Sequence, residues 1–307
     1  MPFFVLLILA SLCEAWPHQE EVDQAILSGR DLALGRRYDE AMRLFQGLVI
    51  MDTRSPVGWF YQALTLEIKM TDIERKEEEL VFFAMIDSTV AVVQRSIQDH
   101  GRRPDDLFYL GMAYGLRGAH EARCTRWFSA FLDTRRGAGI LREVVLLDST
   151  LYDAYFGIGT YTYWRSRFTS KFVWLPFIED YRGQGIASVQ LAVERGRYLD
   201  VGAMSGLVWI LVEEERFDEA VALARMLTLR FPEARIFRRD LAMALEKRGA
   251  LEEARLLYEK MMTDYDAAGC EERVVMCLKA LAEIAEKEGD RGRIAAIRRD
   301  ILKYSKT

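Results

Sequence analysis

The stretch Leu107–Tyr114, with the sequence LFYLGMAY, has two counterparts in the same chain. Trp59–Leu66 (WFYQALTL) precedes it and Tyr155–Thr162 (YFGIGTYT) follows it, at equal distances along the chain. In each copy a Phe stands at the second position and an Ala or Gly stands at the fifth. Self-similarity at a fixed period of this size predicts an array in which one supersecondary unit repeats and stacks on its neighbours.

Shorter units flank this central region. Their shared signature is a small residue followed by an aromatic or acidic run that ends in Ala, as in Gly29 with Tyr38-Asp39-Glu40-Ala41, in Phe217-Asp218-Glu219-Ala220, and in Glu252-Glu253-Ala254. These residues resemble the tetratricopeptide repeat, a short helical hairpin. The resemblance implies an all-α fold, a right-handed α-solenoid of stacked helical hairpins. It also implies that Gly29 and Ala41 lie where the two helices of a hairpin cross, since small side chains let helix axes approach.

The units divide the chain after a leader at 1–15 into one helical repeat domain, 16–307. Their expected boundaries are near 22–55, 56–103, 104–151, 152–199, 201–234 and 235–268, followed by a C-terminal cap at 269–307. The three central units are longer than the others, and their extra residues lie between helix A (the first of each hairpin) and helix B (the second), because two sets of small residues repeat in register. The helix A set is Ala63, Gly111 and Gly159, and the helix B set is Thr89, Gly137 and Gly185.

The extra residues carry their own pattern. We expect the second helix of the first long unit to begin near Asp72, and Gly118 to end the first helix of the next unit. The charged run 72–79 predicts a solvated helix face. Apolar residues in corresponding positions predict a second packed layer along one edge of the solenoid; they are Leu80, Phe83, Phe128 and Phe131, with Trp127 adding bulk.

The composition narrows the class of protein. Apolar residues make up 50% of the chain and charged residues 29%, as in soluble folded proteins, and the net charge of -5 argues against a nucleic-acid binder.

His120 and Cys124 stand four apart on a helix, but two ligands without a third predict no metal. Catalytic and cofactor motifs are absent from the sequence, so we expect a non-catalytic protein without a cofactor. An enzyme with dispersed catalytic residues is the alternative.

The N-terminus resembles a secretory signal. Residues 2–12 are apolar, and Cys13 and Ala15 are small residues placed for cleavage before Trp16. This pattern predicts a signal peptide at 1–15 and an exported protein, periplasmic or secreted. Lipid anchoring at Cys13 is the alternative, although Leu12 does not fit the usual residue before such a cysteine.

The repeated aromatic residues suggest a binding surface. In proteins with the repeat that this chain resembles, the helix A position of Phe60, Phe108 and Phe156 faces a concave groove. We therefore expect a protein or peptide partner in that groove. The candidate partner-binding residues are Phe108, Phe156, Tyr163, Trp164, Trp209, Arg117 and Arg126. The Arg excess would favour an acidic partner.

Alternatives stay open for this surface. Aromatic residues at helical spacing also pack in the core between repeats. We favour this core position for Phe60, and for Phe108 the core and the groove are equally supported. The Arg residues are equally typical of the solvated face of a long helix. A further alternative is a protein that binds a membrane or lipid surface through the aromatic insert 168–178.

Overall fold

The computed structural model describes residues 19–73, 76–169 and 179–304, and within these ranges every regular element is a helix. The helices are α1 (Gln19–Leu34), α2 (Tyr38–Met51), α3 (Val57–Ile73), the short 3-10 helix η1 (Lys76–Glu78), α4 (Glu79–His100), α5 (Pro104–Arg123), α6 (Trp127–Leu147), α7 (Ala154–Thr169), α8 (Arg182–Arg195), α9 (Asp200–Glu213), α10 (Phe217–Arg230), α11 (Arg235–Arg248), α12 (Leu251–Asp266), α13 (Glu271–Glu288) and α14 (Arg291–Tyr304). The predicted signal peptide 1–15 and most of the insert 168–178 lie outside the described residues.

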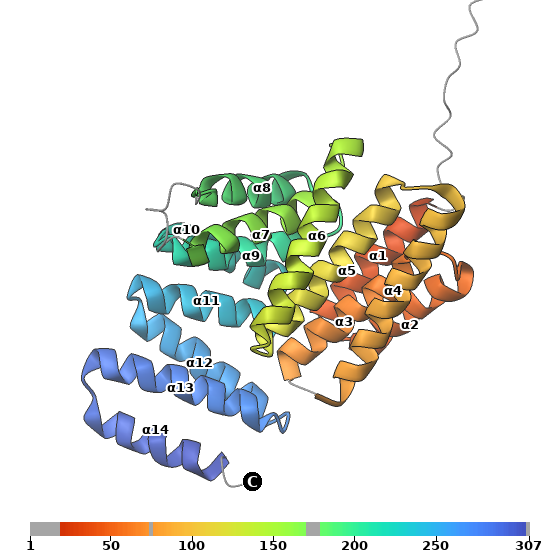
Figure 1. The fold of residues 1–307 in the computed structure, drawn as a ribbon. Helices are drawn as coiled ribbons and strands as arrows, with labels where there is room; N and C mark the ends of the chain where they lie inside the picture. Colours follow the sequence, from red (N-terminus) through yellow and green to blue (C-terminus); the bar gives the residue numbers. More distant parts are fainter. Residues whose placement is uncertain (1–18, 74–75, 170–178, 305–307) are drawn as a thin grey trace, which may run out of the picture.

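Consecutive helices pair as hairpins, and the hairpins stack side by side from α1 to α14 (Figure 1). Hairpins inside the array pack against the hairpin before and the hairpin after, and the buried apolar side chains form two clusters, one mainly in the N-terminal half and one mainly in the C-terminal half. The predicted all-α solenoid of stacked hairpins is therefore confirmed.

A recurring turn joins the two helices of a hairpin. A residue with a left-handed backbone lies two positions before helices α2, α6, α10, α12 and α14; these residues are Arg36, Thr125, Glu215, Gly249 and Gly289, with φ from 58° to 89°. The lengthened hairpin α5–α6 thus closes with the same turn as the short ones. Its extra residues extend both helices, since α5 has 20 residues and α6 has 21 where α9 and α10 have 14 each.

Two expected helix ends were wrong. Helix α4 begins at Glu79 rather than near Asp72, because α3 continues through Asp72 to Ile73. Helix α5 continues through Gly118 to Arg123. A Cβ on Gly118 would lie 2.5 Å from the Thr134 side chain and 2.9 Å from its backbone nitrogen. This glycine therefore serves the close approach of α5 and α6 rather than a helix end.

The small residues of helices A and B meet as the register predicted. A Cβ on Gly137 would lie 2.6 Å from the backbone oxygen of Gly111, and one on Gly185 would lie 2.9 Å from that of Gly159. Backbone touches backbone at both crossings, so any side chain there would push the helices apart. At the first hairpin the glycine has a different partner, because a Cβ on Gly29 would meet the ring of Phe45 at 2.2 Å.

The N-terminal repeats contact repeats of the C-terminal half. Arg235 at the start of α11 donates two hydrogen bonds, of 2.8 and 2.9 Å, to the carboxylate of Asp72 at the end of α3. Tyr38 donates to the same carboxylate at 2.7 Å, and Asp72 is only 1% exposed. The prediction that the run 72–79 is solvated was therefore wrong at Asp72. Farther along, Arg30 of α1 pairs with Asp200 of α9 at 2.8 Å.

Among the described residues one helix, α4, is long and apolar enough to cross a membrane by length and composition. A core helix that meets the same criterion is mostly buried, whereas 22% of the apolar window of α4 is buried. In this fold α4 lies between α3 and α5 and buries Phe82, Ile86 and Val93 against them.

Candidate functional site

The predicted aromatic ladder is part of the core. Phe60 is 1% exposed and Phe108 is 5% exposed, and both pack edge-on against Tyr109 with ring centres 5.6 and 5.2 Å away. Tyr163 is fully buried at the crossing with Gly185, and its hydroxyl donates to Glu214 at 2.9 Å. The assignment of Phe108 and Tyr163 as groove anchors was therefore wrong. N-terminal repeats also contact C-terminal repeats directly, as Asp72 does Arg235.

Three other predicted aromatic residues keep some exposed surface. Phe156 is half-buried and lies against Gly206 of α9, while Trp164 is half-buried and stacks edge-on with Tyr163 at 5.2 Å. Trp209 is exposed, and its indole nitrogen donates to the buried carboxylate of Asp240 at 3.1 Å. Binding by these three stays a prediction, although each already has a partner within the fold.

The two predicted arginines are paired. Arg117 donates two hydrogen bonds, of 2.8 and 2.7 Å, to Asp133, so it ties α5 to α6. Arg126 pairs with Glu121 and, at 2.6 Å, with Glu79. Both cations are already satisfied by carboxylates, which weakens the expectation that they attract an acidic partner.

The predicted second apolar layer is a surface instead. Phe128 is 78% exposed, and Leu80, Trp127 and Phe131 are exposed as well, because none of the described residues packs over these ends of α4 and α6. Among the expected members of this layer Phe83 is half-buried, with its ring edge-on to Phe82.

Seven of the exposed residues of α6 share one face. Their spacing of three, four or seven positions is that of a single helical stripe. We call this stripe the α6 face; it consists of Trp127, Phe128, Phe131, Leu132, Arg135, Arg142 and Leu146. Within the described part of the chain neither Arg135 nor Arg142 pairs with a carboxylate, since Arg142 instead contacts Thr162 and the ring of Tyr161.

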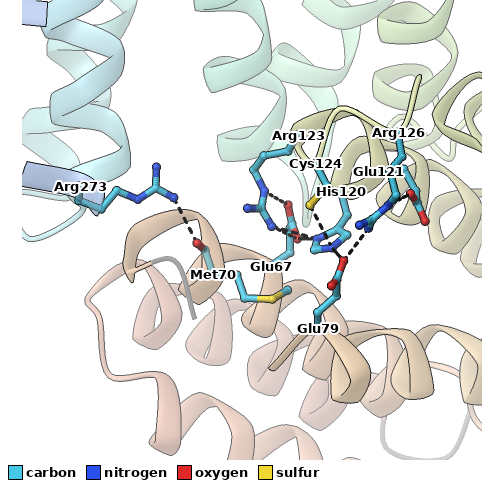
Figure 2. A network of polar contacts seen from close by, with 9 residues as sticks. All are labelled: Glu67, Met70, Glu79, His120, Glu121, Arg123, Cys124, Arg126 and Arg273. Carbon is cyan, nitrogen blue, oxygen red and sulfur yellow. Dashed lines mark hydrogen bonds and ion pairs between the residues drawn. The ribbon is translucent and has the colours of Figure 1, made fainter. Parts of the chain in front are cut away.

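A polar network lies at the same end of the lengthened hairpins. His120 of α5 is 1% exposed and stacks on Phe82 with ring centres 4.6 Å apart. Its Nδ1 lies 2.6 Å from Glu67 Oε2, and its Nε2 lies 3.0 Å from Glu79 Oε1 (Figure 2). The Cys124 sulfur is 3.7 Å from the same Nε2. The structure thus gives the His120–Cys124 pair a third possible ligand, Glu79, which stands 41 residues away from His120 in the sequence.

The network is electrostatically coupled. Burial lowers the pKa of His120, but hydrogen bonds to Glu67 and Glu79 outweigh it, and the pKa is raised above its usual value. The hydrogen bond from His120 and the one from Arg126 hold the pKa of Glu79 below its ordinary range. Charges of both signs are therefore held together at a buried imidazole.

Comparison with known proteins agrees with this architecture. The solved C-terminal part of a TPR repeat-containing protein from Cytophaga hutchinsonii is 17% identical, covering 92% of this chain and 96% of that one, with a TM-score of 0.45. This chain has an all-α fold of stacked helical hairpins. The Rap protein complexed with Competence and Sporulation Factor is 12% identical and covers 93% of this chain and 77% of that one, with a TM-score of 0.55. No protein-family model matches the repeat chain, and no curated protein matches it.

Proposed function

We propose that this protein is a non-catalytic binding scaffold that docks an apolar, acid-flanked helical segment of a protein partner on the α6 face. The observation that carries the proposal is the exposure of Trp127, Phe128, Phe131 and Leu132 in one stripe that continues into Arg135 and Arg142.

Contact between apolar side chains and water is unfavourable, so a partner that covers the α6 face gains free energy. Contiguous exposed apolar side chains on a soluble protein mark an interaction site far more often than scattered ones do. Aromatic residues such as Trp127 and Phe128 dominate binding energy when a partner buries them. A helical stripe matches a helical partner, whose own apolar residues recur at the same spacing. The similar fold of Rap, solved with a bound factor, supports ligand binding by an array of this kind.

The charge on the α6 face selects the partner's chemistry. Arg135 and Arg142 follow the apolar cluster along the same helix, and among the described residues no carboxylate neutralises them. Acidic residues next to the apolar stripe of a partner would meet these cations and fix the direction in which its helix lies.

The experiment uses two displayed libraries of amphipathic helical peptides that differ only in having Glu or Lys beside the apolar stripe. We expect the full chain to enrich peptides from the acidic library, with affinities that fall as salt rises. The double change Trp127→Ser with Phe128→Ser should weaken their binding by roughly 2 kcal/mol or more. The matched control is Met226→Ser with Leu229→Ser on α10, which removes exposed apolar side chains elsewhere.

Two outcomes contradict the proposal. Equal enrichment of the two libraries would remove the role of the arginines, and unchanged binding by the Trp127 and Phe128 variant would remove the α6 face. Vesicles of anionic phospholipid provide the membrane arm. Sedimentation with vesicles that is lost in the same variant, without peptide enrichment, would replace the protein partner with a lipid surface.

We also propose that the scaffold acts after export, on the strength of the apolar leader and the cleavage pattern at residues 1–15. Intact-mass measurement of exported protein should show the loss of these residues. Exported protein that retains Met1 would contradict this.

A further inference from the structure

Three potential metal ligands converge at the end of the lengthened hairpins. Glu79 comes from the first residue of α4, and His120 and Cys124 come from the last turn of α5 and the residue after it. One ligand atom of each lies within 4.8 Å of the other two (Figure 2). The i and i+4 spacing on α5 places the imidazole and the thiol on one side of the helix.

Both ring nitrogens of His120 lie against carboxylate oxygens, one of Glu67 and one of Glu79. Glu67 can only accept, so Nδ1 at 2.6 Å from it carries a proton. In its protonated form the imidazole donates from Nε2 to a carboxylate oxygen of Glu79 3.0 Å away, and in its neutral form a lone pair on Nε2 faces that oxygen. Two acceptors at that distance require a positive charge between them, either a proton or a metal ion.

The thiol favours the metal. A proton shared by His120 and Glu79 gives no role to the Cys124 sulfur, which lies 3.7 Å from the same Nε2. Donor atoms bound to one tetrahedral zinc ion lie about 3.3–3.8 Å from one another. Two of the three separations, 3.0 and 3.7 Å, are close to these values, and the third, between Glu79 and Cys124, is at most 4.8 Å. Imidazole, thiolate and carboxylate are all zinc donors.

The surrounding charges also suit a divalent cation. The network contains three carboxylates and two guanidinium groups, from Glu67, Glu79, Glu121, Arg123 and Arg126. With a thiolate at Cys124 and a neutral His120, the net charge of the carboxylates, guanidinium groups and thiolate is two negative charges. Arg126 keeps Glu121 as a partner when the Glu79 oxygen binds metal.

We propose that Glu79, His120 and Cys124 bind a zinc ion, with Glu67 as the positioning residue that fixes the His120 ring. On binding, zinc replaces the proton between His120 Nε2 and Glu79, the Cys124 thiol gives up its proton as well, and both protons pass to solvent, so that the sulfur binds as thiolate. Carboxylates behind a zinc-bound imidazole commonly play the part of Glu67. Three protein ligands leave a fourth position for water or for a donor atom of another molecule. The ion would lock α4 to α5 next to the α6 face.

The test titrates zinc into the full chain after removal of metal by chelation, and uses cobalt(II) as a spectroscopic substitute. We expect one equivalent to bind, a rise in melting temperature with zinc, and a thiolate-to-cobalt charge-transfer band. Cys124→Ser should abolish the band and weaken zinc binding by more than about 100-fold, beyond the loss of an orienting partner. Cys270→Ser, which changes a thiol on another helix pair, is the control and should bind like wild type.

The positioning role has its own measurement. Glu67→Ala should weaken zinc binding about tenfold, and Glu67→Gln should restore most of it, because the amide oxygen still accepts from Nδ1–H. Equal zinc affinity in wild type and Cys124→Ser would overturn the site and leave a proton between His120 and Glu79. If Cys124→Ser does not fold, the cobalt spectrum of wild type decides, and a spectrum without the charge-transfer band rejects the site.

Discussion

The extra helical turns of α3 and of α6 differ in what covers them. The last turn of α3 lies inside the molecule, where Asp72 meets Arg235 and the backbone oxygen of Met70 accepts a hydrogen bond from Arg273 at 3.3 Å. The first turns of α6 hold Trp127 and Phe128 in solvent. Both arise from the same lengthening of the central repeats.

The difference between α3 and α6 shows that extra helical turns in a solenoid can become either buried structure or exposed surface. A longer hairpin projects past the band where neighbouring repeats stack. Where the superhelix turns back on itself, the projection meets another repeat and becomes buried structure. Where it points outward, the projection stays bare, and its side chains are free to bind something else. The position of a repeat along the superhelix therefore decides whether its extra residues stabilise the fold or form a surface.

The largest effect should come from breaking the buried end of α3. Asp72→Ala leaves Arg235 as a buried charge without its carboxylate, which costs about 3–5 kcal/mol in the free energy of unfolding. Urea denaturation measures this cost. Glu77→Ala, an exposed acid from the same charged run, is the matched control and should change stability by less than about 0.5 kcal/mol. Similar losses in the two variants would show that the α3 extension carries no structural role.

A smaller effect should appear inside the α5–α6 hairpin. Gly137→Ala places a methyl group 2.6 Å from the backbone oxygen of Gly111, so we expect a loss of about 1–3 kcal/mol. Gly139→Ala, two positions along the same helix, meets nothing within 4 Å and should gain up to about 1 kcal/mol from helix propensity. Thermal melts of the pair check the sign of each change. A stabilised Gly137→Ala protein would contradict the close crossing.

The sequence predicts this part of the molecule well, and the physical reason is local. Gly111 and Gly137 recur at the period of the repeat, and a hairpin's internal packing depends on residues within one unit. The burial of Phe108 could not be predicted in the same way. Phe108 stands at the same repeated position as the half-buried Phe156, so the repeat alone does not distinguish core from groove there. The Asp72–Arg235 pair, 163 residues apart, belongs to no repeated position at all.

The polar network around His120 also combines a local pair that the sequence predicts with distant residues that it does not. The His120–Cys124 pair is visible as an i and i+4 spacing, whereas Glu67 and Glu79 reach it from another hairpin. Glu79 also stood in a charged run that predicted a solvated face. Neither carboxylate has a periodic signal, because a contact between two hairpin ends depends on how the repeats are rotated against each other.

The smallest effect on stability should come from the bare end of α6. Phe128→Ala removes a side chain that is 78% exposed, so we expect a change within about 0.5 kcal/mol. Phe82→Ala removes a fully buried ring from the neighbouring helix α4 and should cost about 3–5 kcal/mol. Equal costs would mean that the α6 face is covered in solution, for example by a second copy of the chain, and size-exclusion chromatography would then show the association.

The wide separation of Asp72 and Arg235 in the sequence also affects how the chain folds during synthesis. The carboxylate leaves the ribosome 163 residues ahead of its partner, which at ordinary rates of translation is a delay on the order of ten to thirty seconds. During this interval the first hairpins can form from their own local contacts, but the inner side of α3 has no C-terminal half to cover it. Until α11 arrives, the carboxylate of Asp72 is therefore without the guanidinium of Arg235, and the inner side of α3 is accessible to chaperones.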